Sequence, residues 1–122
     1  MNKYNLKLIN SVHDVPDINS IAIVTNFLDD ISDGIEINYN KTKHEFTDKG
    51  YTAFEFNTHD LNLSNYQKPL SHLLLGNVKY DAKTHNIILK GELNDENLAE
   101  FIQSLIQIYT YLNILTDQNN FF

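Results

Sequence analysis

Arginine and cysteine are both absent from this sequence of 122 residues. All nine basic residues are lysine, so the chain lacks the planar guanidinium group that reads phosphates, carboxylates and guanine edges. This absence argues against a phosphate-handling enzyme and against a module that reads duplex DNA. Without cysteine the chain can form neither a disulfide bond nor a thiolate metal site, which is typical of a cytoplasmic protein.

Long apolar runs are absent as well. No stretch of about eighteen or more apolar residues occurs, and polar residues interrupt the N-terminus where a signal peptide would be apolar. The sequence therefore predicts a cytoplasmic protein without a membrane segment. With 42% hydrophobic and 11% aromatic residues the composition is that of a folded globular protein. The length predicts a single domain over residues 1–122 with one modest core.

Acidic residues outnumber basic residues in this sequence. The chain has sixteen acidic and nine basic residues, which gives a formal net charge of −7. A negative surface repels nucleic acid, so direct nucleic-acid binding is not expected. The same surface suits a partner protein with a basic cleft, such as an enzyme that handles nucleic acids.

Residues 94–116 carry the clearest helix signal. Asn94 is a good N-cap, and Asp95 and Glu96 place negative charge at the positive end of the helix dipole. Apolar residues then recur at the three- and four-residue spacing of a helix with a wide buried face, namely Leu98, Phe101, Ile102, Leu105, Ile108, Tyr109, Leu112 and Leu115. The width of this face predicts a sheet beneath it, or a sheet together with a second subunit.

The C-terminal end of this helix is a candidate contact surface. Tyr109, Tyr111 and Ile114 extend apolar surface towards its far side. A homodimer that forms through residues 98–122 is therefore one hypothesis. Packing in the core of a single chain is the simpler interpretation of the same helix.

Several short segments have the composition or the alternation of apolar and polar residues that is typical of β-strands. Residues 21–25 are β-branched and apolar and predict a buried strand. Residues 35–39 alternate between apolar and polar, and residues 44–46 begin the returning strand of a hairpin. Residues 78–81 and 86–90 predict a second hairpin.

Two other segments are less clear. Residues 2–12 fit a short strand and a short helix equally well, and residues 13–19 are expected to form a loop. After the first hairpin, Asp48 is placed to cap a helical turn over residues 51–54. A third strand over residues 52–57 is the rival interpretation, because two phenylalanines alternate there.

A second helix is predicted to start at Ser64 or Asn65 and to run to Leu75, with Gly76 as its C-terminal stop. Pro69 must then fall in its first turn. These elements predict an α+β fold with two layers. We expect an antiparallel sheet of two hairpins plus one strand, covered by the long C-terminal helix and a shorter helix.

The acidic turn before residue 35 is a candidate calcium loop. Asp29, Asp33 and Gly34 match positions one, five and six of an EF-hand loop, but Ile31 and Asn40, at positions three and twelve, are not carboxylates. The match fails, so no metal site is predicted. A solvated turn explains the aspartates better, because turns collect this residue for backbone reasons alone.

No catalytic constellation is recognisable. The five histidines lack metal-ligand spacing on a helix, no serine lies in a nucleophile elbow, and no glycine-rich phosphate loop occurs. We therefore predict no catalytic residue and no cofactor. The candidate binding residues are the acidic ones near the first hairpin: Asp29, Asp30, Asp33, Glu36 and Asp48.

The order of several short motifs resembles a known family. These motifs are FLD at residues 27–29, DGIEINY at 33–39, FTDKGY at 46–51, GNV at 76–78 and SLIQ at 104–107. They are similar to the domain of unknown function 1828 family of short proteins from Gram-positive bacteria and their prophages. Lys49 stands where the family usually has a second aspartate, and the N-terminal helix that is common in the family is shortened or lost here. The resemblance implies a bacterial or phage cytosolic protein, often carried on mobile elements, without an established activity.

These observations lead to two functional hypotheses. The first is a non-enzymatic protein-interaction module of a prophage or mobile element, which binds an unidentified protein partner and acts, for example, as an acidic inhibitor of a nucleic-acid-handling enzyme. The alternative is a small metal-dependent hydrolase that uses Asp29, Asp33 and Asp48 with a histidine. The second hypothesis requires these carboxylates to converge in space.

Overall fold

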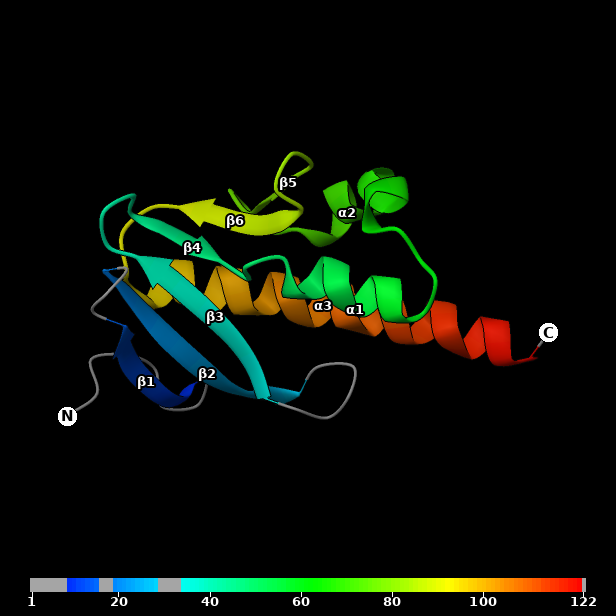
Figure 1. The fold of residues 1–122 in the computed structure, drawn as a ribbon, viewed down its shortest axis with the longest axis horizontal. Coiled ribbons are helices and arrows are strands. Elements are labelled where there is room, and N and C mark those ends of the chain that lie inside the picture. The colour runs from blue at the N-terminus through cyan, green and yellow to red at the C-terminus, as the bar shows by residue number, and fades with distance from the viewer. Residues whose placement is uncertain (1–8, 16–18, 29–33, 122) are drawn as a thin grey trace.

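Six strands and three α-helices make up the described part of the chain, which comprises residues 9–15, 19–28 and 34–121 of a computed structural model (Figure 1). The strands are β1 (Ile9–Val15), β2 (Ser20–Leu28), β3 (Gly34–Asn40), β4 (Glu45–Thr47), β5 (Lys79–Asp81) and β6 (Asn86–Lys90). The helices are α1 (Tyr51–Thr58), the short 3-10 helix η2 (Leu63–Tyr66), α2 (Gln67–Leu73) and α3 (Asp95–Phe121). The fold is α+β, as predicted.

The strands form one open antiparallel sheet in the order β1-β2-β3-β4-β6-β5. Both predicted hairpins are confirmed as β3–β4 and β5–β6, and the strand predicted at residues 21–25 lies within β2. The prediction of five strands was wrong, because β1 adds a sixth and includes residues 13–15, which were predicted as loop. β1 lies at the edge of the sheet and pairs only with β2 among the described strands. Strand propensity depends on the position in the sheet, and an edge strand needs a less regular apolar pattern than a central one, which makes it harder to predict from sequence. Residues 2–8 lie outside the described residues.

The two faces of the sheet differ in polarity. Residues directly opposite in antiparallel strands share a face, and the register aligns Tyr39, Phe46 and Leu89 across β3, β4 and β6. All three are at most 4% exposed and belong to the core. On the other face, the aligned row across all six strands is mostly small or polar, with Ile88 as the one large apolar member: His13, Ala22, Asn38, Thr47, Ile88 and Lys79. The core therefore lies on one side of the sheet, as is common for antiparallel sheets.

The long helix α3 begins as the sequence predicts and covers the core. The Asn94 side chain accepts a hydrogen bond from the backbone N–H of Asn97 at 2.8 Å, which confirms the N-cap. The predicted apolar face is buried from Leu98 to Leu112, and both of these side chains are fully inaccessible. Figure 1 shows α3 passing behind the strands and behind α1 before it ends at Phe121. Within the described residues, no helix combines the length and apolar content that a bilayer span requires.

The segment between the two hairpins is helical. Residues 51–58 form α1, so the rival strand over 52–57 was wrong. Gly50 precedes the helix in the left-handed region at φ 77°, which glycine adopts without strain. The second predicted helix is divided into η2 and α2 and stops at Leu73, earlier than expected, because Leu74 is extended. Pro69 lies in the first turn of α2, as the sequence required.

Candidate functional site

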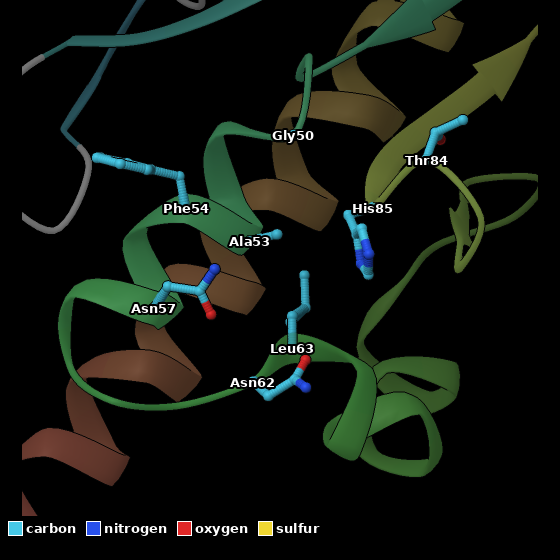
Figure 2. A pocket seen from close by; sticks show the side chains of 8 residues that line it. All are labelled: Gly50, Ala53, Phe54, Asn57, Asn62, Leu63, Thr84 and His85. Carbon is cyan, nitrogen blue, oxygen red and sulfur yellow. The ribbon is translucent and has the colours of Figure 1, made fainter.

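A pocket with a volume of about 380 Å³ lies between α1, η2 and the turn that joins β5 to β6 (Figure 2). This volume is at the lower end of the range for ligand pockets, about 300–1,000 Å³. The described residues that line it are Gly50, Ala53, Phe54, Asn57, Asn62, Leu63, Thr84 and His85. None of these is a lysine, an aspartate or a glutamate. The lining is therefore half apolar and half polar, and it carries no charge while His85 is neutral.

The buried Asp48 carboxylate connects neighbouring segments of the chain beside this pocket through hydrogen bonds. Its Oδ1 accepts hydrogen bonds from the backbone N–H groups of Gly50 and Ile87, both at 2.9 Å, and its Oδ2 accepts one from Thr52 at 3.1 Å. The carboxylate thereby joins the end of β4 to the start of α1 and to β6. It is only 4% exposed, and burial raises the pKa of Asp48 although these hydrogen bonds favour its charged form.

A second buried polar contact connects α1 to α3. The Tyr109 hydroxyl lies 3.3 Å from the Thr52 hydroxyl. Burial raises the pKa of Tyr109, and the neighbouring Glu55 carboxylate raises it further, against the lowering effect of the Thr52 hydrogen bond. Thr52, Glu55 and Tyr109 are each at most 4% exposed. This buried cluster, which comprises Asp48, Thr52, Glu55 and Tyr109, stabilises the helix packing and has no access to solvent.

The pocket edge carries a second polar cluster, made of Ser64, Tyr80 and His85. The Tyr80 hydroxyl lies 2.7 Å from Ser64 Oγ and 2.9 Å from His85 Nδ1, and Ser64 Oγ lies 3.5 Å from the same nitrogen. The phenol is the more acidic of the two hydroxyls, and a neutral imidazole nitrogen is the strongest acceptor of the three groups. We therefore assign Tyr80 as donor to Nδ1 and Ser64 as donor to Tyr80. With Nδ1 accepting, the neutral His85 ring carries its proton on Nε2.

Two hydrogen-bond donors of the pocket remain unengaged by the described residues. His85 Nε2 has no hydrogen-bond partner among them. Asn62 accepts from the backbone N–H of Ser64 through Oδ1 at 3.0 Å, which leaves its Nδ2 hydrogens unused. Figure 2 shows Ala53 and His85 on two sides of the pocket and the Leu63 side chain between them. The pocket therefore presents donors beside an apolar surface.

The structure describes two of the five candidate binding residues, Glu36 and Asp48, and these two differ in exposure. Asp29, Asp30 and Asp33 lie outside the described residues. Glu36 is exposed on β3. Asp48 does not belong to an open acidic surface, because it is buried and each of its carboxylate oxygens accepts a backbone N–H.

Sequence reasoning missed the Ser64–Tyr80–His85 cluster. Its members come from η2, β5 and the following turn, and 16 or more residues separate Ser64 from the other two. No spacing rule connects them. The one local signal was Asn62, a good capping residue two positions before Ser64, and its side chain does accept the Ser64 N–H.

The far side of α3 is less apolar than the sequence suggested. Tyr109 is 4% exposed and belongs to the core, which confirms its place in the predicted buried face and contradicts its alternative assignment to the contact surface. Tyr111 is half-buried and its ring packs edge-on against Tyr66, with 6.0 Å between ring centroids. Ile114 is 50% exposed. The homodimer through residues 98–122 stays a prediction.

Comparison of the sequence and the structure with protein-family models, curated proteins and solved structures finds no match. The resemblance to the domain of unknown function 1828 family therefore stays a prediction. Among the described histidines, aspartates and glutamates, no group of three is arranged to hold a metal ion.

Proposed function

We propose that the protein is a non-enzymatic interaction module of a prophage or mobile element that binds a protein partner through its acidic surface. The partner is a protein with a basic cleft, such as a nucleic-acid-handling enzyme, which the module inhibits by occupying that cleft. The observation that carries this proposal is the net charge of −7 in a chain without arginine. Complementary charge of this kind accelerates association and selects partners.

The local environment of the acidic side chains supports this proposal. Glu36, Glu92, Glu96 and Asp117 are exposed, and none lies within 4.0 Å of a lysine nitrogen in the described part of the chain. The ion pair between Lys41 and Asp14, at 3.4 Å, is at the surface and contributes little. The charges of these four residues are thus not neutralised within the chain, and only Glu36 among them belongs to the predicted binding residues.

The hydrolase alternative receives less support. It requires Asp48 to act with Asp29 and Asp33, but the Asp48 carboxylate already accepts three backbone hydrogen bonds. A metal ion would have to displace buried N–H donors from it, and each such donor would lose its partner at a cost of about 1–3 kcal/mol. The interaction module requires no such rearrangement.

Affinity capture from a bacterial lysate at two salt concentrations tests the proposal. We expect a protein with a basic nucleic-acid-binding cleft to be retained at about 50 mM salt and lost at about 500 mM, because salt screens charges on the surface. Its catalytic activity should fall when the purified module is added. Retention that is equal at both concentrations would contradict an electrostatic mode of binding.

A matched pair of charge variants locates the binding surface. The first variant neutralises the predicted acidic residues with Asp29→Asn, Asp30→Asn, Asp33→Asn and Glu36→Gln. The control removes the same charge elsewhere with Asp60→Asn, Glu92→Gln, Glu96→Gln and Asp117→Asn, all at exposed positions. We expect the first variant to release the partner and the control to retain it. Equal loss in both variants would mean that net charge, and not this surface, determines binding.

A further inference from the structure

We propose that the pocket between α1, η2 and the β5–β6 turn binds an uncharged peptide segment. One apolar side chain of the segment packs against Ala53 and Leu63, and a main-chain carbonyl oxygen accepts hydrogen bonds from Asn62 Nδ2 and His85 Nε2. This site lies apart from the predicted acidic residues and relies on different chemistry. Either proposal can therefore fail without the other.

The lining selects a neutral ligand with an acceptor group. No described lining residue is charged apart from a protonated His85, so a buried carboxylate or phosphate would lose its hydration without gaining a full counter-charge. Asn62 and His85 present donors that no described residue uses. A carbonyl oxygen can accept from both, because it has two lone pairs. Ala53 and Leu63 line the pocket with little exposed area, 8% and 1%, and form a small apolar floor on which one side chain can rest.

The surroundings of the pocket favour a chain over a small molecule. Phe54 lies at the rim with 60% of its side chain exposed, and its ring extends away from the pocket centre (Figure 2). It stacks on Tyr51, which is 38% exposed, with 6.0 Å between ring centroids. Exposed aromatic residues beside a pocket are typical of protein-binding surfaces. A peptide anchored in the pocket can continue along this aromatic pair, whereas a small molecule would leave it uncovered.

Hydrogen bonds at the pocket edge fix the position of the His85 ring and the nitrogen that donates. Its Nδ1 is held by the Tyr80 hydroxyl, and the backbone N–H of His85 donates to the Asp81 carbonyl at 2.7 Å. The ring is therefore fixed both in position and in the nitrogen that carries its proton. Asn62 is fixed in the same way by the hydrogen bond from Ser64. Donors fixed before binding reduce the entropy lost when the ligand binds.

Selection from a random peptide library displayed on phage, with the full chain immobilised, tests this inference. We expect enriched peptides that share one apolar residue within an uncharged stretch. Synthetic copies should bind with an affinity that changes less than about twofold between about 50 and 500 mM salt, since no charge pair forms. Failure to enrich any peptide, or enrichment of charged peptides only, would overturn the proposal.

Asn62→Asp is the most specific variant for this test. Aspartate keeps the oxygen that accepts the Ser64 N–H and replaces the proposed Nδ2 donor with a second oxygen, which repels a peptide carbonyl. We expect affinity for the synthetic peptides to fall at least about tenfold. Asn113→Asp, at an exposed position on α3, makes the same chemical change away from the pocket and should leave affinity unchanged.

A second pair of variants tests the histidine. His85→Gln removes the fixed ring and should weaken peptide binding about two- to tenfold, while His72→Gln at an exposed position on α2 should have no effect. Thermal unfolding of all four variants checks that each one folds. Unchanged peptide affinity in folded Asn62→Asp protein would overturn the proposed site, even if the salt-dependent partner of the acidic surface is still captured.

Discussion

The buried cluster and the pocket-edge cluster contain similar chemical groups in different surroundings. Each combines a tyrosine hydroxyl, a second hydroxyl and a titratable side chain: Tyr109 with Thr52 and Asp48, and Tyr80 with Ser64 and His85. Tyr109 is 4% exposed, whereas Tyr80 is half-buried and His85 is exposed. The two clusters therefore differ in burial rather than in the type of functional group, and only the pocket-edge cluster is accessible from outside the protein.

The two clusters also differ in how completely their hydrogen bonds are used. Both Asp48 oxygens accept backbone donors inside the protein, so a ligand would have to compete with the chain itself. His85 uses Nδ1 within the chain, while its Nε2 has no hydrogen-bond partner among the described residues. A cluster that keeps one donor unused can stabilise the fold and still recognise a partner.

Asp48→Ala should produce the largest change in stability. The buried N–H groups of Thr52 and Ile87 would lose their acceptor, at about 1–3 kcal/mol each. Removal of a carboxylate that burial disfavours offsets part of this loss. We expect the free energy of unfolding to fall by about 2–4 kcal/mol, measured from the midpoint of urea unfolding.

Two milder substitutions sharpen this prediction. Asp48→Asn keeps Oδ1 for Gly50 and Ile87 but turns an amide towards the Thr52 N–H, so it should cost less than alanine. Asp117→Asn at an exposed position on α3 should change stability by less than about 0.5 kcal/mol. If Asp48→Ala is as stable as the Asp117 control, the carboxylate does not hold α1 to the sheet.

Tyr109→Phe should have a smaller effect that depends on pH. Near neutral pH it removes the contact with Thr52, at about 1 kcal/mol. The pKa of Tyr109 is raised in the folded state above its ordinary value of 10.0. Stability from the un-ionised phenol is therefore complete below about pH 10 and is lost as the pH rises towards the folded pKa, because only the unfolded chain ionises.

The alkaline part of the stability curve measures this effect. Above about pH 10 the native protein should lose up to about 1.4 kcal/mol per pH unit from this residue, and Tyr109→Phe should remove that contribution. Tyr111→Phe changes a half-buried tyrosine on the same helix and should leave the decline in place. Identical slopes in the native protein and in Tyr109→Phe would show that the phenol ionises freely in the folded state.

The sequence predicted those parts of the fold that have local signals. The α3 cap at Asn94 and both hairpins depend on residues close together in the chain, and all three were found. The first part of β1 was left open between strand and helix, and residues 13–15 were wrongly predicted as loop, because pairing with β2 rather than local composition makes this segment a strand. The boundary of α2 was misplaced because Leu74 leaves the helix before the predicted glycine stop.

The candidate site was beyond the reach of sequence patterns for a physical reason. Asp48 could be predicted to cap the start of α1, and it does accept the Thr52 N–H. Its bond to Ile87 spans 39 residues, so no local pattern shows that the carboxylate is buried beneath β6. The pocket likewise joins three separate segments, and only the tertiary fold brings Ser64 and His85 together.

Tyr80→Phe should have the smallest effect on stability and the clearest effect on the His85 ring. The lost hydrogen bonds lie near the surface, where water replaces them, so we expect a decrease of about 0.5–1 kcal/mol. In the native protein at about pH 8, where an ordinary imidazole is neutral, nitrogen NMR should place the His85 proton on Nε2. In the variant, Nδ1 loses the Tyr80 donor and keeps only the long contact of 3.5 Å with Ser64 Oγ, so the two tautomers should mix, while the His72 ring stays unchanged in the same spectra. A native His85 proton on Nδ1 would reverse the assigned donors. The pocket-edge cluster would then resemble the buried one, because the His85 proton would be used within the cluster and only Asn62 would remain as a donor for a peptide.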